Sequence, residues 1–161
     1  MASLRIEIRE SVEINGNDYG SYNTVKIDNI NEVSKRTLTI PSGSQQEIIG
    51  MSTSIGSGTF LEKDVRYIRM TNLTDNNPII LTFKNERDDE FNMSLDQGQS
   101  FIYSGISGSG VIDSFAASSS ALPSISYPYT PSTLPLADLV NVRAISSGSQ
   151  NSNLELFVAS M

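Results

Sequence analysis

The chain has no cysteine, no histidine and no tryptophan among its 161 residues. Without cysteine there is no disulfide, no thiolate nucleophile and no cysteine-based zinc site. Without histidine the chain lacks the commonest general base and the commonest transition-metal ligand. These absences exclude a serine triad and a cysteine protease, because both mechanisms use histidine as the base.

A pair of carboxylates of the glycosidase kind is the remaining enzymatic alternative, because the chain has 18 acidic residues. Their spacing nominates no pair, and most of them fall in turns or at the polar positions of strands. We therefore predict that the protein is not an enzyme, with no catalytic residue, no metal ligand, no cofactor and no small-molecule substrate.

Charge and hydropathy restrict the partners. The formal net charge is −7 and the sequence pI is about 4.5, so the surface repels phosphate backbones and nucleic acid is not an expected partner. No run approaches the ~20 apolar residues of a membrane span. Arg5 and Glu7 interrupt the place where a signal peptide needs an apolar run, so we expect synthesis in the cytoplasm.

Period-two alternation is the main structural signal, and it is clearest in residues 65–72, 79–84, 90–95 and 99–103. Successive side chains of a strand point to opposite faces, so this pattern predicts half-buried antiparallel strands. We expect an all-β fold: one antiparallel β-sandwich or jelly roll spanning residues 1–161, with about eight to ten short strands. The predicted core residues are Ile68, Met70, Leu81, Phe83, Phe91, Met93, Leu95 and Phe101.

Further strands are predicted on both sides of that block. Leu4, Ile6 and Ile8 share one face of an N-terminal strand, and Asn15-Gly16 is the strongest short hairpin signal. Other predicted strands cover residues 24–28, 36–40 and 47–51. Residues 138–145 and 154–158 are predicted to form a C-terminal hairpin. Helix is limited to a single turn at residues 29–35 or 134–139.

Residues 104–136 differ from the rest of the chain, because Asp113 is their only charged residue and Ser, Gly and Pro dominate. Such a stretch is too long for an ordinary loop. The four prolines at positions 123, 128, 131 and 135 stiffen its second half, which reduces the entropy lost on docking. We predict an arm that contacts a neighbouring subunit; a loop folded back over its own sandwich is the alternative. The candidate interface residues are Leu122, Ile125, Tyr127, Tyr129 and Leu134.

Three motifs that resemble functional sites are interpreted as structural. The glycines at positions 105, 108 and 110 lack the following Lys and helix of a phosphate-binding loop. Residues 86–90 are acidic, but they lack the ligand spacing of a calcium loop and include Arg87, so we predict a solvated hairpin turn. The glycosylation triplets that begin at Asn72 and Asn92 are interpreted as chance matches.

Sugar binding is the alternative function. Small acidic β-sandwiches can bind carbohydrate through exposed aromatic side chains, for instance in adhesion to a host surface. Here only Tyr127 and Tyr129 form a local aromatic pair, and packing of that pair against a protein surface explains it equally well.

One block of the chain resembles a known class of proteins. The block comprises residues 65–77 (VRYIRMTNLTDNN), 80–86 (ILTFKNE), 89–91 (DEF) and 95–101 (LDQGQSF). It resembles the central part of small virion proteins of marine tailed bacteriophages of the cyanophage type, as do residues 4–8 and 30–36. The resemblance implies a non-enzymatic β-domain that is made in the host cytoplasm and built into the virion. It would contact other copies of itself and other virion proteins, as a capsid decoration or as a tail, neck or fibre component.

Overall fold

The structure is a computed structural model that describes residues 2–54, 56–86, 88–104, 113–115 and 136–161. These residues form fourteen strands and no helix. The strands are β1 (Ala2–Arg9), β2 (Glu13–Ile14), β3 (Asn17–Asp18), β4 (Tyr22–Ile30), β5 (Glu32–Ile40), β6 (Gln46–Ser52), β7 (Phe60–Leu61), β8 (Val65–Asn72), β9 (Ile79–Asn85), β10 (Glu90–Leu95), β11 (Ser100–Ser104), β12 (Asp113–Phe115), β13 (Leu136–Ser146) and β14 (Ser152–Ser160).

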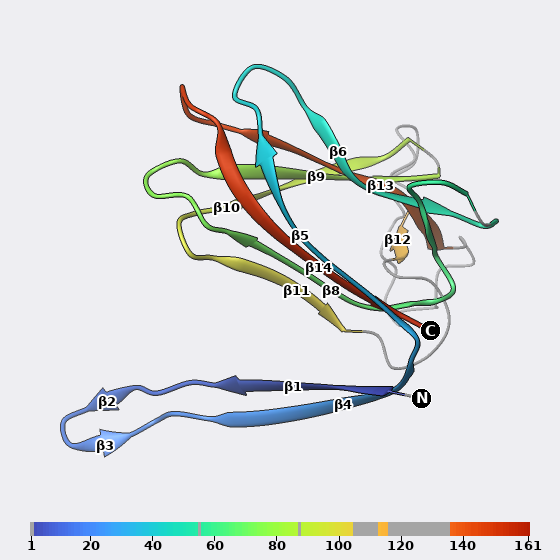
Figure 1. Ribbon diagram of the computed structural model, residues 1–161. Coiled ribbons are helices and arrows are strands. Elements are labelled where there is room, and N and C mark those ends of the chain that lie inside the picture. Colours follow the sequence, from blue (N-terminus) through green and yellow to red (C-terminus); the bar gives the residue numbers. More distant parts are fainter. Residues whose placement is uncertain (1, 55, 87, 105–112, 116–135) are drawn as a thin grey trace, which may run out of the picture.

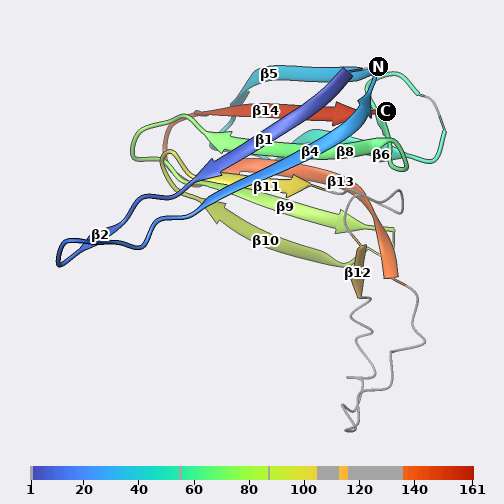
Figure 2. The same ribbon diagram turned by 90° about the horizontal axis from the view of Figure 1, so that it is seen from below.

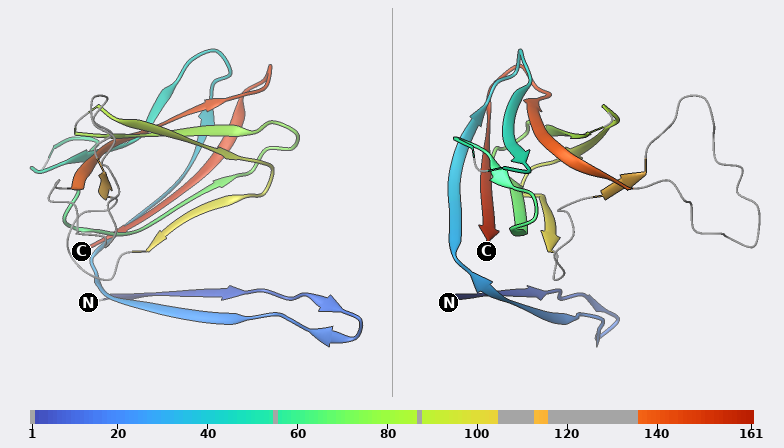
Figure 3. Two further views of the ribbon diagram at one scale, coloured as in Figure 1. Left: turned by 180° about the vertical axis from the view of Figure 1, so that it is seen from behind. Right: turned by 90° about the vertical axis from the view of Figure 1, so that its right-hand side faces the viewer.

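Two sheets form a sandwich, and a separate two-stranded ribbon lies beside it (Figure 1). The first sheet has the order β11-β8-β14-β5. The second has the order β10-β9-β13-β6-β7, with β12 paired to β13. Figure 3 shows the two layers from the side, with the ribbon below them.

The pairing in the sandwich is that of a jelly roll. The pairs β5–β14, β6–β13, β8–β11 and β9–β10 are all antiparallel. Each pair encloses the next one in the sequence, from β5–β14 on the outside to β9–β10 on the inside. Successive pairs in this order lie in alternate sheets. The pairings β14–β8 and β13–β9 complete each sheet. Two sheets of four such strands define the jelly roll, so the predicted all-β sandwich is confirmed in this form.

The core lies between the two sheets and receives the alternating apolar residues of both. Burial of a large aliphatic or aromatic side chain stabilises a fold by about 1.5–3 kcal/mol, so this cluster is the main source of stability. Its largest fully buried side chains are Phe83, Ile40, Ile49, Ile68, Met70, Ile79, Leu81, Leu154, Leu156, Val142 and Val158.

Five of the eight predicted core residues are buried: Ile68, Met70, Leu81, Phe83 and Leu95. Met93 and Phe101 are partly buried and pack against the core. The prediction for Phe91 is wrong, because this side chain is 43% exposed. Phe91 belongs to β10, the last strand at one side of its sheet, and its ring is stacked on Phe83 of the neighbouring strand.

The predicted C-terminal hairpin is also wrong. Both strands exist, as β13 and β14, but they belong to different sheets. The connection crosses the sandwich and is held by hydrogen bonds from the backbone N–H groups of Ser146 and Ser147 to the carbonyl oxygens of Pro41 (3.0 Å) and Pro78 (2.9 Å). The four strands of residues 65–103 are also divided: β8 and β11 belong to the first sheet, and β9 and β10 belong to the second.

Two further differences concern secondary structure. Residues 29–35 form the end of β4 and the start of β5 instead of a helical turn, and the described part of 134–139 belongs to β13. The described residues hold fourteen strands where eight to ten were expected. The excess comes from the four strands of the ribbon and from the short strands β7 and β12.

The N-terminal ribbon consists of β1 paired with β4, and its end is closed by β2 and β3. The predicted Asn-Gly turn is confirmed, because Asn15 and Gly16 have φ angles of 52° and 78°, the left-handed region that a tight two-residue turn requires. Seen from below, the ribbon crosses the outer face of the sheet that contains β8 and β14 (Figure 2).

Candidate functional site

A cleft of about 350 Å³ lies between the ribbon and the outer face of the first sheet. We call it the ribbon–sheet cleft. Its ribbon side is β1, whose alternation turns one apolar face toward the sheet. Its sheet side is formed by β8, β11 and β14. Its lining residues are Leu4, Arg5, Ile6, Glu7, Ile8, Tyr67, Arg69, Ser100, Ile102 and Phe157.

A small second core holds the base of the ribbon on the sandwich. It contains four buried residues: Ile27, Ile30, Tyr67 and Ala159. The rings of Tyr67 and Phe157 meet edge to face, with centroids 5.7 Å apart. Burial raises the pKa of the Tyr67 phenol above its ordinary value, and the nearby Arg69 opposes that rise. Leu4 and Ile6 of the ribbon pack against this core, whereas Ile8, further along β1, remains exposed.

The charges beside the cleft are paired, with an excess of cations. Arg69 and Lys35 both bind the carboxylate of Glu155, and the Lys35 ammonium lies 3.2 Å from it. Arg5 binds Glu7 at 2.7 Å on the ribbon side. The Arg5–Glu7 pair is neutral and lies on the opposite face of β1 from Leu4 and Ile6. On the sheet side two cations, Arg69 and Lys35, share one carboxylate, which gives this surface a net positive charge in a chain of net charge −7.

The far end of the ribbon, residues 10–22, has a different composition. We call it the ribbon tip. It contains three acidic residues and no Lys or Arg. It also carries four exposed large apolar or aromatic side chains: Val12 (47% exposed), Ile14 (54%), Tyr19 (65%) and Tyr22 (57%).

The ribbon tip has defined backbone structure. The backbone amides of Glu10 and Tyr19 donate to the carbonyl oxygens of Ser21 (2.8 Å) and Val12 (2.7 Å). Gly20 is required, because a Cβ atom at this position would overlap the backbone oxygen of Glu10. The apolar side chains are therefore presented on a closed hairpin.

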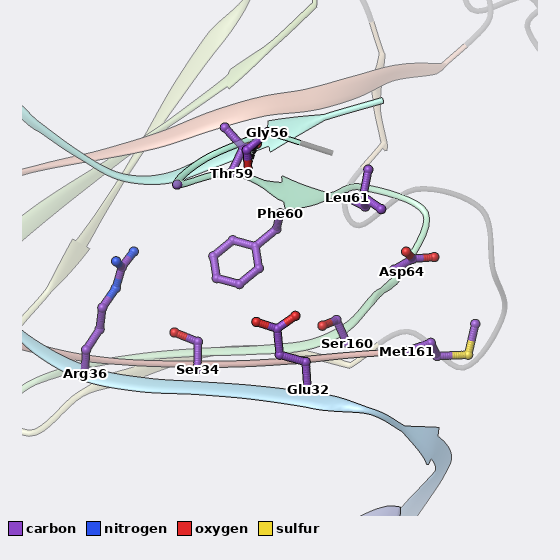
Figure 4. Close-up of a pocket in the computed structure, with 11 residues that line it drawn as sticks. Glu32, Ser34, Arg36, Gly56, Thr59, Phe60, Leu61, Asp64, Ser160 and Met161 are labelled. Atoms are coloured by element: carbon purple, nitrogen blue, oxygen red, sulfur yellow. Dashed lines mark hydrogen bonds between the residues drawn. The ribbon is translucent and has the colours of Figure 1, made fainter. Parts of the chain in front are cut away.

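A second hollow, of about 490 Å³, lies between β5 and β7 at the opposite side of the sandwich (Figure 4). The Phe60 ring points into it from one side, and Ser34 and Glu32 point toward it from β5. Arg36 also lines this edge pocket, and its guanidinium donates to the carbonyl oxygen of Ile48 at 2.8 Å. Asp64 lies at its far end. The pocket thus combines an aromatic ring, a cation, two carboxylates and hydroxyl groups.

Glu86, Asp88 and Asp89 lie between β9 and β10, and Glu90 is the first residue of β10, so the turn predicted at this place is confirmed for the described residues. Their carboxylates bind separate partners: Asp88 binds Lys84 at 2.7 Å, Asp89 accepts from the Asn85 side chain at 3.2 Å, and Glu90 binds Arg143. The hydrogen bond and the charge of Lys84 lower the pKa of Asp88. Within the part of the chain that the structure describes, no group of three or more acidic side chains is arranged to hold a metal ion.

The predicted interface residues Leu122, Ile125, Tyr127, Tyr129 and Leu134 lie outside the described residues. On either side of these residues in the sequence, Phe115 on β12 is paired with Leu136 on β13.

Sequence reasoning missed the ribbon–sheet cleft, because the hairpin signal at Asn15-Gly16 does not reveal what the hairpin packs against. The acidic and apolar composition of residues 10–22 was the available signal for the ribbon tip.

Comparisons with known proteins identify no relatives: no protein-family model, no curated protein and no solved structure matches this chain. None of the described residues forms a helix that is long and apolar enough to cross a membrane.

Proposed function

We propose that this chain is a non-enzymatic structural component of a tailed-phage virion that assembles through protein–protein contacts. The observation that carries the proposal is the ribbon tip, which presents apolar side chains on a projecting hairpin. A two-stranded hairpin alone is marginally stable in water, so such an element gains stability when another surface covers it. The position in the particle would be that of a capsid decoration or of a tail, neck or fibre protein.

The jelly roll supports this role, because double-sheet jelly rolls are common in viral capsid proteins; the fold is also found in lectin domains. The resemblance of residues 65–101 to marine phage virion proteins points in the same direction. The net charge of −7 favours a location away from packaged nucleic acid.

Residues 104–136 have a place in this proposal as an arm. Phe115 and Leu136 are paired, and 20 residues lie between them in the sequence. At about 3.3 Å per residue, a strand of ten residues out and ten back reaches roughly 33 Å, far enough to contact a neighbouring subunit. Leu122, Ile125, Tyr127, Tyr129 and Leu134 are the proposed anchors, because they are the large side chains of a stretch that can enter a crevice without desolvating ions.

Two measurements test the proposal. Light scattering of the purified full chain over a range of concentrations should detect oligomers. Mass spectrometry of purified virions should detect the chain, and its copy number separates a decoration, with many copies, from a neck, baseplate or fibre protein, with few. A chain that is absent from the particles would contradict the virion proposal.

Carbohydrate binding is the second candidate function, and the edge pocket is the observation that favours it. The Phe60 ring offers a surface for the C–H groups of a sugar ring, and Arg36, Glu32 and Ser34 offer hydrogen-bonding groups beside it. Glycan-array screening of the full chain, compared with the Phe60→Ala variant, tests this function. Binding that is lost in Phe60→Ala supports it, whereas no binding, or binding that Phe60→Ala leaves unchanged, contradicts a sugar site in this pocket.

A further inference from the structure

We infer that the ribbon tip of one copy docks into the ribbon–sheet cleft of a second copy. This inference rests on the proposed assembly function and names the surfaces that make the contact. The tip is residues 10–22, and the cleft is the space between β1 and the outer face of β8, β11 and β14.

Charge is the first reason to pair these two surfaces. The tip has Glu10, Glu13 and Asp18 and no cation, which gives it a net charge of −3. The sheet side of the cleft has an excess of one positive charge, from Arg69 and Lys35 against Glu155. Opposite net charges favour the encounter of two copies and oppose the contact of one tip with another.

Apolar surface is the second reason. The tip exposes four large side chains that no described part of its own chain buries: Val12, Ile14, Tyr19 and Tyr22. The lining of the cleft includes the exposed side chains of Ile8 and Ile102, together with the side chain of Phe157. A volume of about 350 Å³ is within the range of pockets that hold a few side chains. Docking would bury apolar groups on both sides, which is the main favourable term in protein association.

The turn of the tip cannot reach the cleft of its own chain. The end of the ribbon projects beyond the sandwich (Figures 1 and 2). Asn15 at the turn is seven residues beyond Ile8 at the end of the cleft, a distance of roughly 23 Å at about 3.3 Å per residue. The occupant must therefore come from another molecule.

A tip-to-cleft contact joins two different surfaces, so it is a heterologous contact. Such a contact produces a closed ring when the rotation between neighbours closes, and an extended chain when it does not. In both arrangements the tip of each copy docks into the cleft of one neighbour, and its own cleft is occupied by the tip of another.

Disulfide cross-linking tests the contact directly, because the chain has no cysteine of its own. Full chains that carry Val12→Cys are mixed with full chains that carry Ile102→Cys, and one of the two has an added tag so that the mixed product has its own mass. Oxidation should give the mixed disulfide. The matched control pairs Val12→Cys with Leu73→Cys, an exposed site outside the cleft, and should give none.

A charge exchange provides a second test. Glu13→Lys should weaken self-association about fivefold, because one charge pair at the edge of an interface is lost and becomes a repulsion. Adding Lys35→Glu on the sheet side to the same chain should restore the association. If it does not, the assigned charge complementarity is wrong.

The outcomes separate this inference from the assembly proposal. If the chain forms oligomers but Val12→Cys cross-links to Ile102→Cys no better than to Leu73→Cys, the tip-to-cleft contact is wrong and assembly stands. Cross-linking of the tip in particles to a different protein, and not to a second copy, also overturns the inference. A chain that stays monomeric at every concentration contradicts both.

Discussion

The side chain of Asn72 donates a hydrogen bond to the backbone oxygen of Leu95, with 2.9 Å between the two atoms. Asn72 ends β8 in one sheet and Leu95 ends β10 in the other, so this bond joins the two layers of the sandwich. The same amide group donates to the carbonyl oxygen of Asn77 and accepts from the backbone N–H of Thr74, each at 2.9 Å. Asn72 is fully buried, which is a structural reason why its glycosylation triplet is a chance match in the folded chain.

Asn72→Ala should lower the free energy of unfolding by about 2–4 kcal/mol, because it removes three hydrogen bonds and leaves buried backbone groups without partners. Urea unfolding of the full chain measures this loss. Asn153→Ala, at an exposed position, is the control and should change stability by less than about 0.5 kcal/mol. Equal effects of the two substitutions would contradict the role assigned to Asn72.

Phe83 and Phe91 are stacked with ring centroids 4.6 Å apart, but only Phe83 is buried. Phe83→Ala should cost about 3–5 kcal/mol of stability, because it leaves a cavity between the sheets. Phe91→Ala should cost about 1–2 kcal/mol, because roughly half of its surface is already in water and the stacking contact is the main loss. Thermal or urea unfolding compares the two. An equal loss in both would mean that the ring of Phe91 is covered in solution.

Gly20→Ala should disrupt the ribbon tip and leave the sandwich intact. The added Cβ atom would overlap the backbone oxygen of Glu10, so the hairpin must open locally. Hydrogen exchange should show faster exchange at the amides of Glu10 and Ser21, with an unchanged unfolding midpoint. Gly43→Ala, whose added Cβ would contact nothing within 4 Å, is the matched control and should leave both measurements unchanged.

Stability should fall at alkaline pH, in part because of Tyr67. Burial raises the pKa of its phenol above the ordinary value of 10.0, so the folded chain holds the proton more tightly than the unfolded chain. The stabilisation from the neutral phenol is complete below pH 10 and is lost as the pH rises through the higher pKa of the folded state. Tyr67→Phe should therefore flatten the decline in the unfolding free energy above about pH 10. Tyr19→Phe, at an exposed position, should leave the decline unchanged.

Deletion of residues 121–135 tests the arm. The shortened chain should stay folded and lose its ability to assemble or to join particles, because Leu122, Ile125, Tyr127, Tyr129 and Leu134 are removed with it. Circular dichroism reports the fold and light scattering reports assembly. Unfolding would show that the stretch belongs to the chain's own core, and normal assembly would show that it has neither role.

Strand positions were predictable from the sequence because alternation is a local property. Residues 65–72 and 90–95 were predicted to the residue, and 79–84 and 99–103 to within one residue at each end. The Asn15-Gly16 turn was predictable for the same reason, because few residues accept a positive φ. The composition of the chain also determined its acidic charge and the absence of His and Cys chemistry.

Only the tertiary structure decided which strands are neighbours. Alternation shows that a strand has one buried face, but not which strand or sheet covers it. β14 therefore pairs with β5 from far earlier in the chain instead of with the adjacent β13. Phe91 follows the same alternation as Phe83 and is still exposed, because its place at the side of the sheet is set by long-range pairing. The ribbon–sheet cleft exists for the same reason: its two sides come from strands far apart in the sequence, and only folding brings Ile6 of β1 and Phe157 of β14 to the same cleft.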